Sequence, residues 1–189
     1  MLKQSICAYV YLLLTAFAPL LANAAPSDPR DVNPIEVGSA LPEAQITNAQ
    51  GTTVSIREIA GAQKSILIFY RGSWCPYCTK HLASIGQHEQ AILKKGYQII
   101  AISPDQPEAT RNYIDKSDLN YSVYSDSTMA ATKAFGLAFE WENQKSNRTE
   151  LRPVPAVFIT DAAGRIRFRH FDPNYRERLS PEALLKALD

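Results

Sequence analysis

Apolar residues along the chain follow two alternating patterns. The first is a short continuous apolar run, and the clearest example is 65–70, Ser-Ile-Leu-Ile-Phe-Tyr, whose length indicates a buried strand. After it, apolar side chains recur at helical spacing: Cys78, Leu82, Ile85 and Ile92. Gly96 ends this helical pattern, and a second apolar run follows at 97–102. These segments predict a strand, a helix and a parallel strand joined by a right-handed crossover.

The remainder of the chain continues the alternation. Short strands are expected at 44–47, 53–56 and 122–125, and helices at 107–116, at 127–135 and from Pro181, which follows the capping residue Ser180. A hairpin is expected from Pro155 to His170, with its turn at 161–164. The segment 136–152 has no clear period and is either a surface insertion or a loop near the active site. The pattern predicts an α/β fold, a sheet with helices on both faces.

The two cysteines in Trp74-Cys75-Pro76-Tyr77-Cys78 lie where the first long strand should pass into a helix. Cys75 is therefore expected at a helix N-terminus, where unpaired amide groups and the helix dipole favour a thiolate. Cys78 lies one helical turn further on and can attack a mixed disulfide formed at Cys75. We predict that Cys75 is an exposed nucleophile and that Cys78 is its resolving partner.

Other functions of this cysteine pair fit less well. A structural zinc site needs about four ligands, and only His81 lies close in the sequence. Haem attachment requires a histidine directly after the second cysteine, where the chain has Thr79. A purely structural disulfide would gain little, because the stabilisation grows with the length of the closed loop. We therefore expect redox chemistry, with no metal and no cofactor.

The first 24 residues are typical of a signal peptide. Lys3 precedes a largely apolar run from Ile6 to Leu21, and 22–24, Ala-Asn-Ala, is a small-x-small cleavage site. An uncleaved membrane anchor is the alternative interpretation. Cleavage would remove Cys7 and leave a flexible leader at 25–40, followed by one domain at 41–189. We expect a periplasmic or secreted protein that has no membrane contact after cleavage.

Charge narrows the choice of partners. Without Lys3 the chain carries 19 basic and 19 acidic side chains. No basic stripe suggests nucleic acid, and no strong net charge suggests a membrane surface. We expect the partner to be a protein with a thiol or disulfide, or a small oxidant.

Three stretches of this chain resemble a known family. They are 69–78 (Phe-Tyr-Arg-Gly-Ser-Trp-Cys-Pro-Tyr-Cys), 154–159 (Val-Pro-Ala-Val-Phe-Ile) and 172–175 (Asp-Pro-Asn-Tyr). Together with the order of strands and helices, they resemble the thioredoxin fold, a central mixed sheet with helices on both faces. More closely, they resemble the peroxiredoxin-like branch of the alkyl hydroperoxide reductase/thiol-specific antioxidant superfamily. The resemblance implies a cis bond between Val154 and Pro155, facing the disulfide.

Further site residues follow from the same resemblance. Trp74, Pro76 and Tyr77 would shape the rim around the sulfurs, and Val154 and Pro155 would hold backbone groups open for a substrate. Arg71, four residues before Cys75, could supply a cation that lowers the pKa of the thiol. Glu140 and Glu142 are candidate proton acceptors for Cys78 only if the 136–152 segment folds over the site.

Two positions differ from a typical peroxiredoxin. The threonine that orients the peroxide is replaced by Gly72, and the activating arginine would stand at Pro155. We therefore expect an exported thiol-disulfide oxidoreductase first and a thiol peroxidase second. A third alternative is a copper-handling protein that uses Cys75, Cys78 and a distal imidazole such as His170, because thiolates bind Cu(I).

Overall fold

The computed structural model describes residues 24–144 and 146–189, so the expected signal peptide, except for Ala24, lies outside the described residues. Two sheets contain all the strands of this part of the chain: β1 Gln45–Thr47, β2 Thr53–Ser55, β3 Ser65–Phe69, β4 Gln98–Ser103, β5 Ser122–Ser125, β6 Ala138–Asn143, β7 Arg148–Pro153, β8 Ala156–Thr160 and β9 Ile166–Phe171. The helices are α1 Ile56–Gly61, α2 Pro76–Gly86, α3 Glu89–Lys94, α4 Pro107–Lys116, α5 Ala130–Ala134 and α6 Pro181–Ala187.

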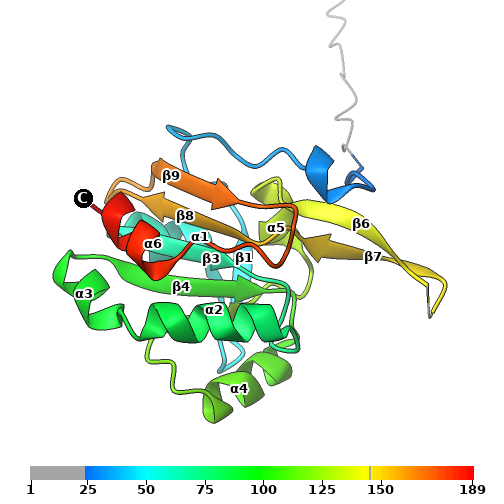
Figure 1. The fold of residues 1–189 in the computed structure, drawn as a ribbon, viewed down its shortest axis with the longest axis horizontal. Helices are drawn as coiled ribbons and strands as arrows, with labels where there is room; N and C mark the ends of the chain where they lie inside the picture. The colour runs from blue at the N-terminus through cyan, green and yellow to red at the C-terminus, as the bar shows by residue number, and fades with distance from the viewer. Residues whose placement is uncertain (1–23, 145) are drawn as a thin grey trace, which may run out of the picture.

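A mixed seven-stranded sheet forms the centre of the domain (Figure 1). Its strand order is β2-β1-β5-β4-β3-β8-β9, in which β3 pairs parallel to β4 and antiparallel to β8. The strand β3 is buried along its whole length, as its uninterrupted apolar run predicts. The expected α/β architecture is confirmed.

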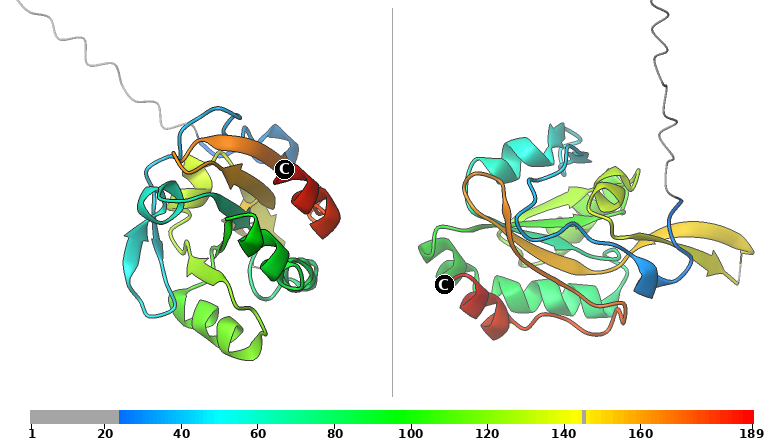
Figure 2. Two further views of the ribbon diagram at one scale, coloured as in Figure 1. Left: turned by 90° about the vertical axis from the view of Figure 1, so that its left-hand side faces the viewer. Right: turned by 90° about the horizontal axis from the view of Figure 1, so that it is seen from above.

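Alternate residues of β3 pack into two separate cores. Ile66 and Ile68 face the helices α2 and α6, whereas Leu67 and Phe69 face α1 and α5. This alternation follows from the two-residue period of a strand. Figure 2 shows the resulting arrangement, with helices on both faces of the sheet.

Helix boundaries differ from the prediction at one important place. The single helix expected between Cys75 and Gly96 is two helices, α2 and α3, separated by two residues. The C-terminal helix begins as predicted, with the Ser180 hydroxyl accepting a hydrogen bond from the backbone N–H of Ala183 at 3.2 Å.

The leader at 25–40 is packed against the domain instead of forming the expected flexible tether. The backbone N–H of Ile35 donates to the carbonyl of Phe135, and that of Gly38 donates to the carbonyl of Ile166. Ile35 also packs against the core that contains Phe135. These contacts hold the leader against the end of α5 and the edge strand β9.

The segment 136–152, which had no clear period, contains the antiparallel hairpin β6–β7. It projects from the main sheet (Figure 1). Within 24–144 and 146–189, no helix combines the length and hydrophobicity needed to cross a membrane.

Candidate active site

Cys75 lies at the start of α2, as predicted. It is the N-cap residue with an extended backbone, and Pro76 occupies the first helical turn. The Cys75 carbonyl accepts hydrogen bonds from the backbone N–H groups of Cys78 at 2.9 Å and Thr79 at 3.1 Å. The strand β3 and the helix α2 therefore fix the two cysteines one helical turn apart.

Both sulfurs are reduced and buried, which corrects the expectation of an exposed Cys75. Cys75 is 1% exposed and Cys78 is fully buried, because both pack into the core between the sheet and α2. Burial is the main cause that raises the pKa of Cys78 to about 11, and a hydrogen bond with the Cys75 side chain adds to it. The Cys78 thiol is therefore neutral near neutral pH.

The loop before Cys75 is held by a carboxylate from another strand end. Asp105 Oδ2 accepts hydrogen bonds from the backbone N–H of Ser73 at 2.7 Å and from the Ser103 hydroxyl at 3.0 Å. Gly72 has a φ of 142°, and a Cβ atom there would lie 2.3 Å from Trp74 Nε1 and 2.8 Å from Asp105 Oδ1. A larger side chain at position 72 is thus excluded by both space and backbone conformation.

Arginine side chains alternate with aromatic rings beside this loop. The Arg71 guanidinium lies 4.1 Å from the Tyr175 ring centroid and 5.0 Å from that of Trp74. Arg152 of β7 stacks at 3.5 Å on Trp141 and lies 5.4 Å from Trp74. The predicted rim is therefore a cation–π stack that connects the cysteine loop to the hairpin.

Tyr77 belongs to the same rim. Its ring meets Tyr175 edge-on, with the centroids 5.7 Å apart. Trp74 is 56% exposed and Tyr77 is 45% exposed, so both aromatic side chains are accessible to solvent, unlike the two sulfurs. Tyr175 and Arg152 were not predicted as site residues, although Tyr175 lies in one of the stretches that carried the family resemblance.

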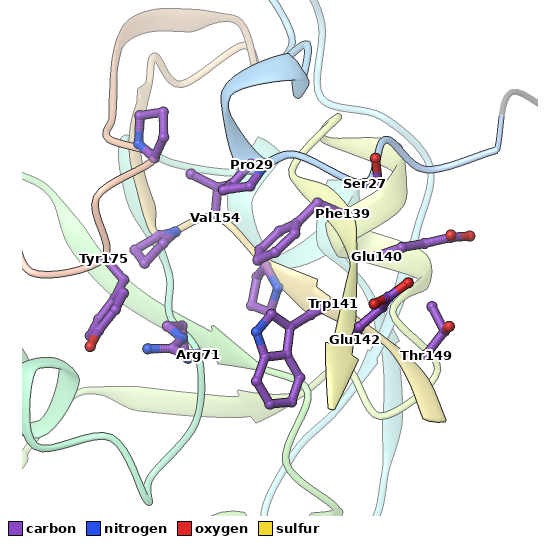
Figure 3. A pocket seen from close by; sticks show the side chains of 13 residues that line it. Ser27, Pro29, Arg71, Phe139, Glu140, Trp141, Glu142, Thr149, Val154 and Tyr175 are labelled. Atoms are coloured by element: carbon purple, nitrogen blue, oxygen red, sulfur yellow. The ribbon is translucent and has the colours of Figure 1, made fainter. Parts of the chain in front are cut away.

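A cavity of about 480 Å³ lies between Arg71 and Tyr175 on one side and the hairpin on the other (Figure 3). Arg71, Val154 and Pro155 line it, as does Tyr175. The hairpin contributes Phe139, Glu140, Trp141 and Glu142. The volume is in the range of small-molecule sites. Three of the predicted substrate-binding residues line the cavity, whereas Trp74, Pro76 and Tyr77 lie outside its lining.

Comparison with known proteins places this site in a family. The sequence model described as "AhpC/TSA family" matches residues 37–169, well over half of the chain. The chain belongs to the AhpC/TSA family. Its thioredoxin fold, with a cysteine pair at the start of a helix, agrees with that membership.

Individual relatives of this AhpC/TSA protein have different names. Peroxiredoxin Bcp of Escherichia coli is 24% identical over 71% of this chain and 85% of the relative. Thiol-disulfide oxidoreductase ResA of Bacillus cereus is 24% identical over 72% of this chain and 70% of the relative. The crystal structure of reduced Prx3 from Vibrio vulnificus in complex with H2O2 covers 82% of this chain and 99% of its own, with a TM-score of 0.73 and 21% identity. The similarity to the Prx3 structure shows a shared fold.

The expected cis bond between Val154 and Pro155 is absent, because no peptide bond in the described residues is cis. The trans form is the lower-energy isomer of an X-Pro bond. It also fits the local hydrogen bonding, in which the backbone N–H of Val154 donates to the Leu137 carbonyl at 2.9 Å. This bond connects the chain entering β8 to the segment before β6.

Sequence reasoning missed Arg178, which lies between β9 and α6. Its Nη2 atom is 3.6 Å from Cys78 Sγ. No local pattern could have indicated this contact, because the two residues are 100 positions apart. The candidate acceptors Glu140 and Glu142 instead line the cavity.

The copper-handling alternative has no third ligand in place. In the described part of the chain, no three His, Cys, Asp or Glu side chains are grouped to hold a metal ion. His170 lies on β9 and shares a small crevice with His81, and that crevice does not include either cysteine. His81 is fixed by a hydrogen bond of 3.0 Å between its Nε2 atom and the Leu179 carbonyl.

Proposed function

We propose that this protein is a thiol peroxidase that reduces hydroperoxides with the Cys75/Cys78 pair. The observation that carries the proposal is the near-complete burial of Cys75 beside Cys78 in an AhpC/TSA protein. Burial on this scale shields the sulfur from a bulky disulfide of a protein partner more strongly than from a small hydroperoxide. The peroxiredoxin name of one relative supports the same choice.

The chemistry balances with the two thiols and one hydroperoxide. The Cys75 thiolate attacks one peroxide oxygen, the O–O bond breaks, and an alcohol or water leaves after taking up a proton. Cys75 is then a sulfenic acid. Cys78 attacks its sulfur, the thiol proton leaves with the hydroxyl as water, and a disulfide forms. A thiol reductant then restores both cysteines by two exchange steps.

Hydrogen-bond donors near Cys75 differ from those of a typical peroxiredoxin. Gly72 replaces the threonine, and the Trp74 ring N–H occupies the space where a side chain at 72 would lie. Pro155 replaces the arginine, and Arg71 brings a guanidinium to the same cavity. We infer that Trp74 and Arg71 provide the donors that orient the peroxide. Pro76, Tyr77 and Val154 complete the proposed substrate-binding surface.

A second candidate function is thiol-disulfide exchange with a protein, which the sequence analysis favoured. The specific observation for it is the absence of both the threonine and the arginine at their family positions. The relative named thiol-disulfide oxidoreductase ResA also supports it. Reduction of insulin disulfides by the protein at a rate far above its rate with hydroperoxides would favour this candidate.

Export to the periplasm or to the medium remains part of the proposal. It rests on the signal-peptide pattern of the first 24 residues. Cell fractionation followed by N-terminal sequencing is expected to find the protein outside the cytoplasm, beginning at Ala25. A cytoplasmic protein that begins at residue 1 would contradict it.

Titration of the reduced protein with hydroperoxide, followed by mass spectrometry, tests the peroxidase proposal. One equivalent should form one Cys75–Cys78 disulfide. In a Cys78→Ser variant, dimedone should trap a sulfenic acid on Cys75, and a Cys75→Ser variant should leave the hydroperoxide unconsumed. Equal consumption by the Cys75→Ser variant and the native protein would overturn the proposal.

A further inference from the structure

The side chain of Arg178 faces the resolving sulfur and is held there. Its Nη2 atom lies 3.6 Å from Cys78 Sγ, and its Nη1 atom donates to the Glu177 carbonyl at 2.7 Å. Among residues 24–144 and 146–189, no carboxylate lies within ion-pair distance of this half-buried guanidinium. Its positive charge is therefore available to the sulfur.

The other groups that act on Cys78 come from the loop after β3, from the start of α2 and from α4. The Cys75 side chain is hydrogen-bonded to it at the start of α2, and the backbone N–H of Arg71 points to it from the preceding loop. Tyr70 follows β3, and Tyr113 lies on α4. Burial raises the pKa of both tyrosines, so both are neutral at physiological pH. Neither tyrosine can balance a negative charge on Cys78.

Two histidines, His81 and His170, line the same small crevice as Arg178. Burial is the main cause that lowers the pKa of His81 to about 4, and it also lowers the pKa of His170. The positive charge of Arg178 acts in the same direction on both, while Asp172 partly opposes it at His170. Both imidazoles are therefore neutral near neutral pH, and Arg178 carries the positive charge of this cluster.

We propose that Arg178 is a catalytic residue of the resolving step, in which it stabilises the negative charge that develops on Cys78 as this sulfur attacks Cys75. The inference rests on the proposed function and deepens it. The S–S bond forms while the S–O bond of the Cys75 sulfenic acid breaks. The proton of the Cys78 thiol leaves with the hydroxyl as water, so Arg178 keeps all its protons throughout.

The expected size of the effect follows from the contact. An opposite charge this close lowers the pKa of a thiol by about 1 to 3 units. The logarithm of the intrinsic attack rate of the thiolate falls by about half as many units. Removing Arg178 should therefore slow disulfide closure by about tenfold. Oxidation of Cys75 by the hydroperoxide should change less, because the guanidinium contacts the other sulfur.

The first experiment measures Cys78 without any peroxide. In a Cys75→Ser background, the rate of Cys78 alkylation by iodoacetamide is followed against pH by mass spectrometry. Arg178→Met should move the pH midpoint upward by about one unit or more, and Arg178→Lys should restore part of the shift. Arg167→Gln, an exposed change on β9, is the matched control and should leave the midpoint in place. Superimposed profiles for Arg178→Met and its parent would overturn the inference.

The second experiment measures closure in the protein with both cysteines. After one rapid pulse of hydroperoxide, Arg178→Met should accumulate a dimedone-trapped sulfenic acid on Cys75, whereas native protein should pass quickly to the disulfide. Equal closure rates would also overturn the inference. If Arg178→Met does not fold, Arg178→Gln gives the same comparison without the charge. Failure of native protein to react with hydroperoxide would instead overturn the proposed function, and the alkylation profile would still decide the role of Arg178.

Discussion

The carboxylate of Asp105 accepts a hydrogen bond of 2.7 Å from the backbone N–H of Ser73, 32 positions earlier in the chain. This contact ties the loop before Cys75 to the end of the neighbouring strand β4. The same Oδ2 atom accepts from the Ser103 hydroxyl at 3.0 Å. The position of Cys75 therefore depends on two adjacent strands and not on the cysteine motif alone.

Asp105→Ala should loosen this loop. The variant leaves two donors without their acceptor, so the free energy of unfolding should fall by about 2 to 3 kcal/mol. Oxidation of Cys75 by hydroperoxide should slow several-fold. Urea denaturation and rapid-mixing kinetics measure the two effects. Asp115→Ala, on the exposed side of α4, is the control and should change neither the free energy of unfolding nor the oxidation rate. An unchanged oxidation rate in Asp105→Ala would contradict this account of the loop.

Gly72→Thr restores the threonine of a typical peroxiredoxin but should not restore its function. The new Cβ would collide with Trp74 and Asp105, and the φ of 142° is strained for any residue other than glycine. We expect a loss of stability of at least about 2 kcal/mol together with slower peroxide reduction. Gly61→Ala, whose Cβ would have its nearest contact at 3.9 Å, is the control. Faster peroxide reduction by Gly72→Thr would show that the threonine site is still open.

Stability should depend on alkaline pH through Cys78. Its pKa rises from an ordinary 9.0 to about 11 on folding, mainly because the thiol is buried. The folded state thus holds its proton more tightly, so the stabilisation is present below about pH 9 and is lost as pH rises towards about 11. The loss should be about 2 to 3 kcal/mol. Chemical denaturation of the reduced protein at several pH values measures this loss. In Cys78→Ala, the free energy of unfolding should fall less steeply with pH over this range. Equal slopes for Cys78→Ala and native protein would refute the assignment.

Arg152→Met should affect large substrates more than small ones. It removes the guanidinium that stacks on Trp141 and lies near Trp74, so the wall of the cavity loses its support. We expect kcat/KM for cumene hydroperoxide to fall several-fold relative to that for hydrogen peroxide. Arg148→Met, at the other end of the same strand, should leave the ratio unchanged. A proportional loss with both peroxides would mean that the cavity does not bind the organic part of the substrate.

Local sequence patterns predicted the central strands and the helix start well. The apolar run of β3 and the spacing from Cys78 to Ile85 depend only on neighbours along the chain. The hairpin β6–β7 was not predicted, because only β6 alternates clearly, whereas β7 is identified by its pairing with β6 and by the stacking of Arg152 on Trp141. The burial of Cys75 and the approach of Arg178 arise from tertiary packing, which no local pattern encodes.

The rate of Cys75 oxidation tests the central claim most directly. Reduced native protein and glutathione are mixed separately with hydrogen peroxide at the same neutral pH, and the change in tryptophan fluorescence of the protein or the loss of peroxide is followed by stopped flow. The protein should react at least about 100-fold faster, because positioned donors contribute on that scale. A rate no higher than that of glutathione would contradict a peroxidase and favour disulfide exchange.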